Sequence, residues 1–408
     1  MGSPAAPVLI SCDNSVRTDY ALTKGWNWIS INVSNPQSNS VQNLLSNVGS
    51  EGDEIKGQKS VFDKYSSVAG WSGSLTAAGG LKPTDMYKLK LTKAGTAQIN
   101  GTPLDPSKTP ISIAAGWNWI GFVPQYNIAI DEALASYGPK EGDVIKSQRT
   151  FSMYYDQIGW VGTLGILEPG KGYMLQSSAV SSLIYPAKGM LKSGVETQDN
   201  VPAIVNYDVT NFPTNMTIVA ALADSLLDTY GKVLAAYSGS TCVGFAHPIT
   251  VGTTTRYFLT AGGDAVAQNL TFALVDTLSG TQADFVNQLV YSADASEGDL
   301  NAPYVLYKSK ALETNGISLE TVVDAYPNPF TSSLSIKGYL PRESNISVRM
   351  VNTLGKEIVN INAPRQAGVF SLDVQDLAPD SFNNLSQGWY NVEVTTSFGT
   401  YWFKVIRN

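Results

Sequence analysis

The chain has 408 residues and a net charge of −7, and its 43% hydrophobic residues are enough to bury real cores. This length predicts about two to four domains. Charged residues are few at 15%, while Gly and Pro are abundant, a balance that favours short strands joined by tight turns over long charged helices. No run of Lys or Arg occurs. The clustered cations that nucleic acid requires are missing, and we expect no nucleic-acid partner.

Few residues are available for redox or metal chemistry. The two cysteines, Cys12 and Cys242, are far apart, and we expect two unpaired buried thiols rather than a disulfide. The single histidine, His247, excludes a His-rich zinc site, and we expect a structural role for it. We expect no metal site and no cofactor. No segment approaches the roughly eighteen consecutive apolar residues of a membrane span, so we expect a chain that does not cross the membrane.

The first half of the sequence contains an internal duplication. The run GWNWI at residues 25–29 recurs at 116–120. Three further pairs of blocks follow in the same order: EGDEIKGQ with EGDVIKSQ, GWSG with GWVG, and LKP with LEP. The spacing between the copies changes little along the chain, and each copy is long enough to be a domain rather than a solenoid turn.

Each copy is predicted to be a small, mostly β module, the first over residues 1–100 and the second over 101–188. Alternation in each GWNW run predicts a strand with both Trp side chains on one face. Apolar spacing predicts one short helix per copy, at 40–48 and 129–138. The GDxIKxQ block, the Tyr-containing run after it and GWxGxL are predicted to be successive strands.

Residues 195–315 show a different pattern. Six short β-type runs, which begin at residues 216, 232, 242, 256, 270 and 303, have the spacing of a β-sandwich. With AAYSGSTCVGFA ahead of YFLTAGGD, this stretch resembles β-sandwich modules of multidomain surface proteins of the Bacteroidota. That resemblance implies a fold and no activity.

The C-terminal residues 322–408 carry the most specific motifs. They open with Tyr326-Pro327-Asn328-Pro329-Phe330. A turn glycine flanked by alternating apolar residues, Gly355 followed by Lys356, predicts a hairpin. The segment ends with a GWYNVEV run, which contains Gly388 and Tyr390, and with a last strand that contains Lys404. These blocks, in this order, resemble the type A C-terminal sorting domain of type IX secretion substrates.

The resemblance implies an Ig-like sandwich of about seven strands. Pro327 and Pro329 predict that the opening segment is extended and unpaired, and an insert at 379–386 is expected to be a loop. The resemblance also implies binding by the type IX translocon and its outer-membrane β-barrel shuttle protein. A sortase-like enzyme would then cleave the tail and attach the protein to the surface of a bacterium of the Bacteroidota. We therefore expect an extracellular or cell-surface location after transit through the periplasm.

The repeated aromatic residues are candidates for stacking on sugar rings, with core packing as the alternative use. For the GWNW tryptophans, core packing is favoured. For Trp71 and Trp160, which lie between glycines in predicted turns, both uses stay open. Tyr65 and Tyr154, each six residues before its Trp, extend the candidate platform. A surface glycan is accordingly the candidate ligand.

Paired acids precede a predicted strand in each copy, as Glu51 with Asp53 and Glu141 with Asp143. Such pairs suit Ca²⁺ binding or a carboxylate dyad. The sequence Glu-Gly-Asp is more typical of a turn, and its presence in both copies favours a structural corner. No GxSxG or other catalytic motif occurs. We expect a mainly β, non-enzymatic cargo for adhesion or glycan binding; an extracellular polysaccharide-degrading enzyme and a purely structural stalk remain alternatives.

Overall fold

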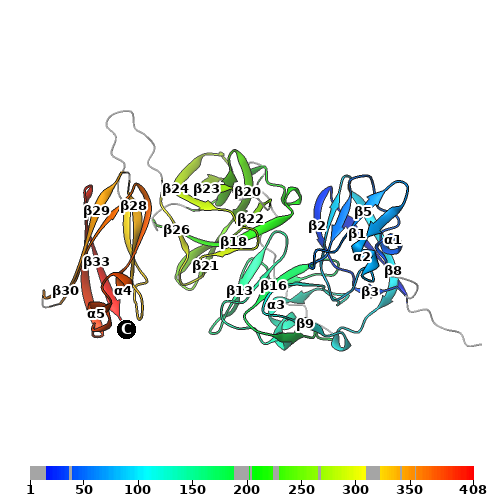
Figure 1. Ribbon diagram of the computed structural model, residues 1–408, viewed down its shortest axis with the longest axis horizontal. Helices are drawn as coiled ribbons and strands as arrows, with labels where there is room; N and C mark the ends of the chain where they lie inside the picture. The colour runs from blue at the N-terminus through cyan, green and yellow to red at the C-terminus, as the bar shows by residue number, and fades with distance from the viewer. Residues whose placement is uncertain are drawn as a thin grey trace, which may run out of the picture.

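The computed structural model describes residues 15–35, 39–187, 202, 205–223, 229–264, 268–308, 322–340, 342–353 and 355–408. This part of the chain is mostly β-strand, as predicted, and its strands form four groups in a row (Figure 1). We name the groups module 1, module 2, the sandwich module and the tail module. Cys12 lies outside the described residues, and Cys242 is buried and unpaired.

Module 1 is built around a five-stranded sheet. Its order is β2 (Gly25–Ile29), β7 (Tyr87–Leu91), β4 (Glu54–Lys56), β5 (Phe62–Ser66) and β6 (Gly70–Gly73). A second sheet holds β1 (Val16–Leu22), β8 (Gly95–Pro103) and β3 (Val33–Ser34), and the short helices are α1 (Val41–Leu44) and α2 (Ser74–Ala77). One face of the five-stranded sheet packs into a core that contains Ile55, Leu89 and Trp71.

Module 2 repeats this arrangement. Its five-stranded sheet has the order β10 (Gly116–Ile120), β16 (Tyr173–Ser177), β12 (Val144–Lys146), β13 (Phe151–Tyr155) and β14 (Gly159–Gly162). Short pairs join β11 (Ile128–Ala129) to β15 (Ile166–Leu167) and β9 (Ile111–Ile113) to β17 (Ser181–Leu183); η1 (Pro106–Lys108), α3 (Ile130–Ala133) and η2 (Ala135–Tyr137) are helical. Corresponding strands occupy corresponding places, so the repeated blocks fold alike. Both predicted helices exist, although each is shorter than predicted.

The sandwich module stacks two sheets. The first contains β21 (Pro248–Val251), β22 (Thr254–Gly263), β18 (Thr214–Leu222), β25 (Ser296–Glu297) and β26 (Tyr304–Leu306). The second contains β20 (Thr241–Ala246), β19 (Lys232–Ser238), β23 (Asn269–Asp276) and β24 (Gln282–Val290), and η4 (Val209–Asn211) precedes both. The run that begins at 242 divides into β20 and β21 at His247. The strand β24 was not predicted.

The tail module is a sandwich of seven strands, as the resemblance implied. One sheet holds β27 (Val322–Tyr326), β28 (Ser335–Leu340) and β31 (Gly368–Asp373). The other holds β30 (Glu357–Arg365), β29 (Ser344–Asn352), β32 (Gly388–Thr396) and β33 (Gly399–Arg407), and the helices α4 (Val374–Leu377) and α5 (Pro379–Asn383) follow β31. Alternate residues of both sheets meet in a single apolar core.

Two expectations for the tail module were wrong. The opening segment is paired, because the Phe330 N–H donates to the Ile406 carbonyl at 2.8 Å and the Asn328 side chain accepts from the Ile406 N–H at 3.0 Å. The prolines lack N–H donors, but Asn328 between them and Phe330 after them supply the groups that pair with the edge of β33. The insert at 379–386 is not only a loop: it contains α5, which buries Phe382 against Phe330 with 5.6 Å between ring centres.

No helix within the described ranges is long and apolar enough to span a bilayer.

Candidate functional site

The GWNW motif forms a turn followed by an edge strand in both modules. Gly25 and Gly116 have φ values of 90° and 89°, which glycine adopts without strain. The Asn side chain braces this turn: the Asn118 amide donates to the Ala114 carbonyl at 2.8 Å and accepts from the Ala114 N–H at 2.8 Å. Asn27 makes the same two bonds with Thr23. The Gly and Asn of the motif therefore set the geometry of the strand that carries the tryptophans.

The two GWNW strands are held by side chains that the modules exchange. Gln58 of module 1 donates to the Trp117 carbonyl at 2.6 Å and accepts from the Trp119 N–H at 2.9 Å. Gln148 of module 2 makes the matching bonds to Trp26 and Trp28, at 2.9 and 3.3 Å. Each Gln occupies the same place in its copy of the GDxIKxQ block. The modules are therefore related by an approximate two-fold axis.

Main-chain hydrogen bonds also connect module 1 to module 2. The Ser30 N–H donates to the Gly170 carbonyl at 3.1 Å, and the Gly121 N–H donates to the Thr84 carbonyl at 2.9 Å. Each bond joins the end of a GWNW strand to the loop that contains LKP or LEP in the other module. An edge strand left open would invite pairing with other chains, and here each module covers the edge of the other.

Tryptophans and one lysine meet at the centre of this interface. Trp28, Met86 and Met174 are buried together, and Trp119 packs against them. Lys88 places its Nζ 4.4 Å from the ring centre of Trp28 and 4.6 Å from that of Trp119. Lys88 is only 3% exposed. Burial lowers the pKa of Lys88 to about 8.

Replacing Lys88 with Met should stabilise the protein at neutral pH, because the equivalent position in module 2 is occupied by the uncharged Met174. The unfolded chain keeps the Lys proton up to about pH 10.4, whereas the folded chain releases it near pH 8. The stability of the wild type should therefore rise between these pH values, and that of Lys88→Met should not. We expect the variant to gain about 2 kcal/mol of unfolding free energy at pH 7. Urea denaturation at pH 7 and pH 10 measures both effects, and a variant that is less stable at both would contradict this account.

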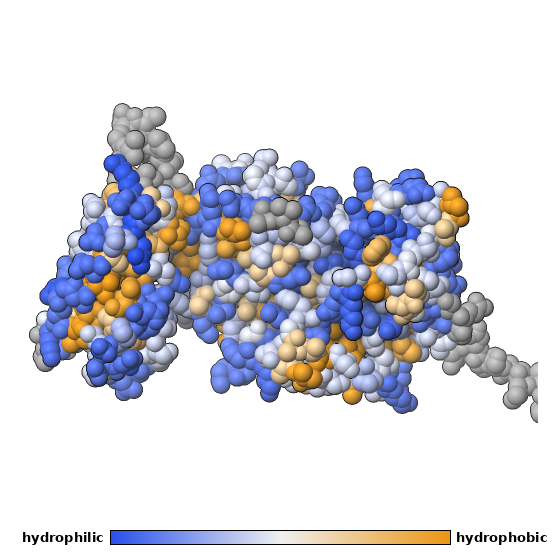
Figure 2. Space-filling model, in the orientation of Figure 1, coloured by the Kyte–Doolittle hydropathy of each residue, from blue (hydrophilic) through white to orange (hydrophobic). Residues whose placement is uncertain are grey.

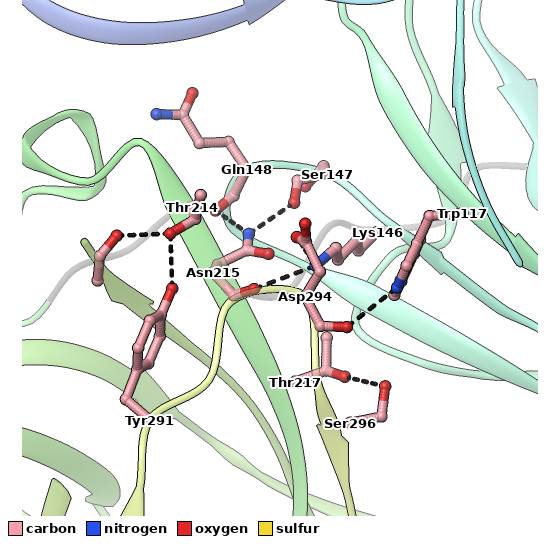
Figure 3. Close-up of polar contacts among 11 residues, drawn as sticks. Trp117, Lys146, Ser147, Gln148, Thr214, Asn215, Thr217, Tyr291, Asp294 and Ser296 are labelled. Carbon is pink, nitrogen blue, oxygen red and sulfur yellow. Dashed lines mark hydrogen bonds and ion pairs between the residues drawn. The ribbon is translucent and has the colours of Figure 1, made fainter. Parts of the chain in front are cut away.

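A second interface joins module 2 to the sandwich module (Figure 3). Lys146 is fully buried, and its Nζ lies 2.8 Å from the Asp294 carboxylate and 3.1 Å from the Asn215 carbonyl. The same ammonium lies 4.4 Å from the ring centre of Trp117, whose indole N–H donates to the Asp294 carbonyl at 3.0 Å. Burial lowers the pKa of Lys146, and the Asp294 carboxylate opposes that shift. Trp117 and Lys146 therefore join module 2 to the sandwich module.

Around this ion pair the contact is polar on one side and apolar on the other. The Asn215 amide donates to the carbonyls of Ser147 and Gln148 at 3.1 and 3.0 Å. Phe151 of module 2 packs on Phe258 of the sandwich module, with 5.7 Å between ring centres. A buried charge that is both paired and hydrogen-bonded beside a packed apolar contact favours one fixed orientation of the two modules.

The predicted aromatic platform is divided between the core and the surface. Trp71 is 2% exposed, and its indole N–H donates to the Val48 carbonyl at 2.9 Å. Trp160 is half-buried, as are Tyr65 and Tyr154. In each module the Tyr and Trp are cross-strand partners with ring centres 5.7 Å apart in module 1 and 5.4 Å apart in module 2. The Trp71 and Trp160 rings therefore do not share one exposed face, and sugar stacking at these residues stays a prediction.

The repeated acids hold the structural corners. Asp53 is buried and accepts from the N–H groups of Ser50 and Thr92 at 2.8 and 2.6 Å. Asp143 is buried and accepts from the N–H groups of Lys140 and Ser178, both at 2.8 Å. Glu51 and Glu141 accept main-chain N–H groups in the same corners. Within the described ranges, no group of three His, Cys, Asp or Glu side chains has the geometry of a metal site.

The remaining motif residues of the tail module have structural places. Gly355 turns the β29–β30 hairpin with φ 77°, and the Lys356 N–H donates to the Asn352 side chain at 2.9 Å. Tyr390 is buried, and its hydroxyl donates to the Ser386 carbonyl at 2.7 Å. Gly388 begins β32 at φ 142°, and the Lys404 ammonium lies 4.2 Å from the ring centre of the exposed Trp389. The hairpin prediction at Gly355 is confirmed.

Sequence reasoning missed the residues that join the modules. Gln58, Gln148 and Lys146 were recognised only as parts of a repeated block, although their recurrence in both copies was an available signal. Asp294 had no such signal, because it lies outside the repeats.

The comparisons with known proteins bear on the tail module. Residues 324–408 match the family described as the secretion system C-terminal sorting domain. The seven-strand tail module, which opens with Tyr-Pro-Asn-Pro-Phe, is therefore a sorting domain. The protein belongs to the class of exported proteins that carry such a domain. The chain is a substrate of the type IX secretion system, directed to the cell surface or the extracellular space.

Two solved structures share a weak similarity with the chain. The first is dimeric latent PorU from Porphyromonas gingivalis, with 10% identity, a TM-score of 0.22 and coverage of 65% of this chain and 29% of that chain. The second is the BSP domain of a biofilm associated protein, with 10% identity, a TM-score of 0.17 and coverage of 97% and 63%. The chain thus spans less than two thirds of either structure, and similarity at this level defines neither fold nor function. No curated protein matches the sequence.

Proposed function

We propose that the protein is a non-enzymatic adhesion protein, carried to the cell surface by its sorting domain, that attaches to external material including glycans. The observation that carries this proposal is the interlocking of module 1, module 2 and the sandwich module. Residues shared by the repeats, such as Gln58 and Gln148, are used to fix the modules to one another. These three joined β modules form one body that holds a binding surface in a fixed position.

The carboxylates of the repeats support adhesion over catalysis. A glycosidase needs two carboxyl groups that face a substrate from opposite sides of the scissile bond. Asp53 and Asp143 are instead buried and hydrogen-bonded to main-chain N–H groups. A purely structural stalk would share this architecture but would bind nothing outside the cell.

Cells that lack the protein should attach less well to polysaccharide-coated surfaces, and expression of the full chain should restore attachment. Purified protein added in excess should compete with the cells for the coating. Attachment that is unchanged without the protein would contradict adhesion and favour the stalk. Release of reducing ends from the coating by purified protein would contradict the non-enzymatic proposal.

A further inference from the structure

One face of the module 1 sheet has a matching face in module 2, and their surroundings differ. Side chains of directly paired strand residues project to the same side of a sheet. Register pairs Trp26 with Lys90, Glu54 with Lys90 and Glu54 with Lys64, and it pairs Lys56 with Phe62. These residues therefore share the side of the sheet that faces away from the core of module 1.

In module 2 the matching face is apolar and covered. Val144 stands where module 1 has Glu54, and Met153 stands where it has Lys64. Both are buried, together with Phe151, against Val219 and Phe258 of the sandwich module. Lys146 is the one cation retained there, and Asp294 of the sandwich module neutralises it. Module 2 thus shows that this face of the fold is a docking surface.

In module 1 the same face is cationic and open. We name Lys56, Lys64, Lys90 and Phe62 the lysine face. Lys64 and Lys90 are exposed, Phe62 is 45% exposed and the Lys56 side chain is 43% exposed. Hydrophilic residues cover much of module 1 where it borders the sandwich module (Figure 2).

Charge and aromatic contacts on the lysine face are arranged together. The ammonium groups of Lys56 and Lys90 lie 4.8 and 5.6 Å from the ring centre of Trp26, and that of Lys64 lies 5.9 Å from the ring centre of Phe62. Among the residues paired above, the one acidic residue is Glu54, whose carboxylate lies 3.0 Å from the Lys56 ammonium group. The lysine face is therefore positive on a chain whose net charge is −7.

We propose that the lysine face binds an anionic polysaccharide, a chain of sugars that carry carboxylate or sulfate groups. Lysines spaced across neighbouring strands complement the regularly spaced charges of such a polymer, and the exposed Phe62 ring offers apolar contact to a sugar ring. The occupant is identified by charge complementarity and by the role of the matching face in module 2. This inference rests on the proposed adhesion function and names the class of ligand.

Binding of the full-length protein to immobilised polygalacturonate, dextran sulfate and neutral dextran tests the proposal. The wild type should bind the two anionic polymers, more weakly as salt is added, and should not bind neutral dextran. The double variant Lys64→Gln/Lys90→Gln should bind about tenfold more weakly, because two exposed charge contacts are lost. Phe62→Ala should also weaken binding. This loss should persist at high salt, where the contribution of charge is already reduced.

The matched control is Lys93→Gln/Lys140→Gln, which removes the same charge at exposed turns outside the lysine face and should bind like the wild type. Equal weakening by both double variants would overturn the proposal, since a diffuse charge effect would explain it. Failure of the wild type to bind either anionic polymer, or stronger binding to double-stranded DNA, would also overturn it. Loss of cell attachment without the protein, combined with unchanged polymer binding by the lysine-face variant, would refute this site and leave the adhesion function intact.

Discussion

Deletion of residues 322–408 should abolish delivery to the cell surface and leave the rest of the chain in the periplasm. The deleted residues form a complete sandwich with its own core, so the modules before it lose no strand partner and should remain folded. The expected change is from full surface signal to background. Antibody labelling of intact cells, together with fractionation of the periplasm, measures it.

The control for this deletion is the full chain with Lys93→Gln/Lys140→Gln, which leaves the tail module unchanged and should reach the surface normally. Surface labelling of the truncated chain at the wild-type level would show that export does not depend on the sorting domain. Loss of the truncated chain from every fraction would indicate degradation, which a strain that lacks periplasmic proteases would distinguish from failed export.

Asp294→Ala should destabilise the body of the protein by about 3 kcal/mol, because the fully buried Lys146 ammonium then loses its carboxylate. Lys146→Met should cost far less, since an apolar side chain suits the cluster formed by Val144, Phe151 and Phe258. The double variant Asp294→Ala/Lys146→Met should recover most of the stability that Asp294→Ala alone loses. Thermal and urea unfolding measure all three variants.

The exposed pair of Arg17 and Asp19 supplies the control for this series. Its side chains are 53% and 51% exposed, and Asp19→Ala should leave the free energy of unfolding almost unchanged because solvent screens this pair. If Asp294→Ala were as mild as Asp19→Ala, or if the double variant were no better than Asp294→Ala, the buried ion pair would not be what holds module 2 to the sandwich module.

Local patterns in the sequence were sufficient for the strands and the repeat. Period-two alternation placed Trp26 and Trp28 on one face, and the observed register keeps them there. Alternation indicates that a face is covered and does not indicate by what. Trp28 packs with Trp119 of the other module, and Lys146 forms an ion pair with Asp294, 148 residues away. Such contacts follow from tertiary arrangement, which no local window contains.

The missed strand β24 has a similar cause. Asn287 occupies an inward position among apolar residues and so interrupts the alternation on which the prediction depends. It is buried because its amide donates to the Val305 carbonyl at 3.0 Å and accepts from the Tyr307 N–H at 2.7 Å. A polar residue that is satisfied by a strand distant in sequence looks like a break when only the sequence is available.

The exchange of Gln58 and Gln148 across an approximate two-fold axis has a consequence for a protein that leaves the cell. A pair of identical single repeats, joined only by noncovalent contacts, would separate on dilution into the surrounding medium. Fusion of the two copies in one chain keeps each at an effective concentration on the order of millimolar for the other, however dilute the protein becomes. Duplication of the repeat thus converts a concentration-dependent association into a permanent one, and it frees the two copies to diverge, one to carry lysines and the other to receive a neighbouring module.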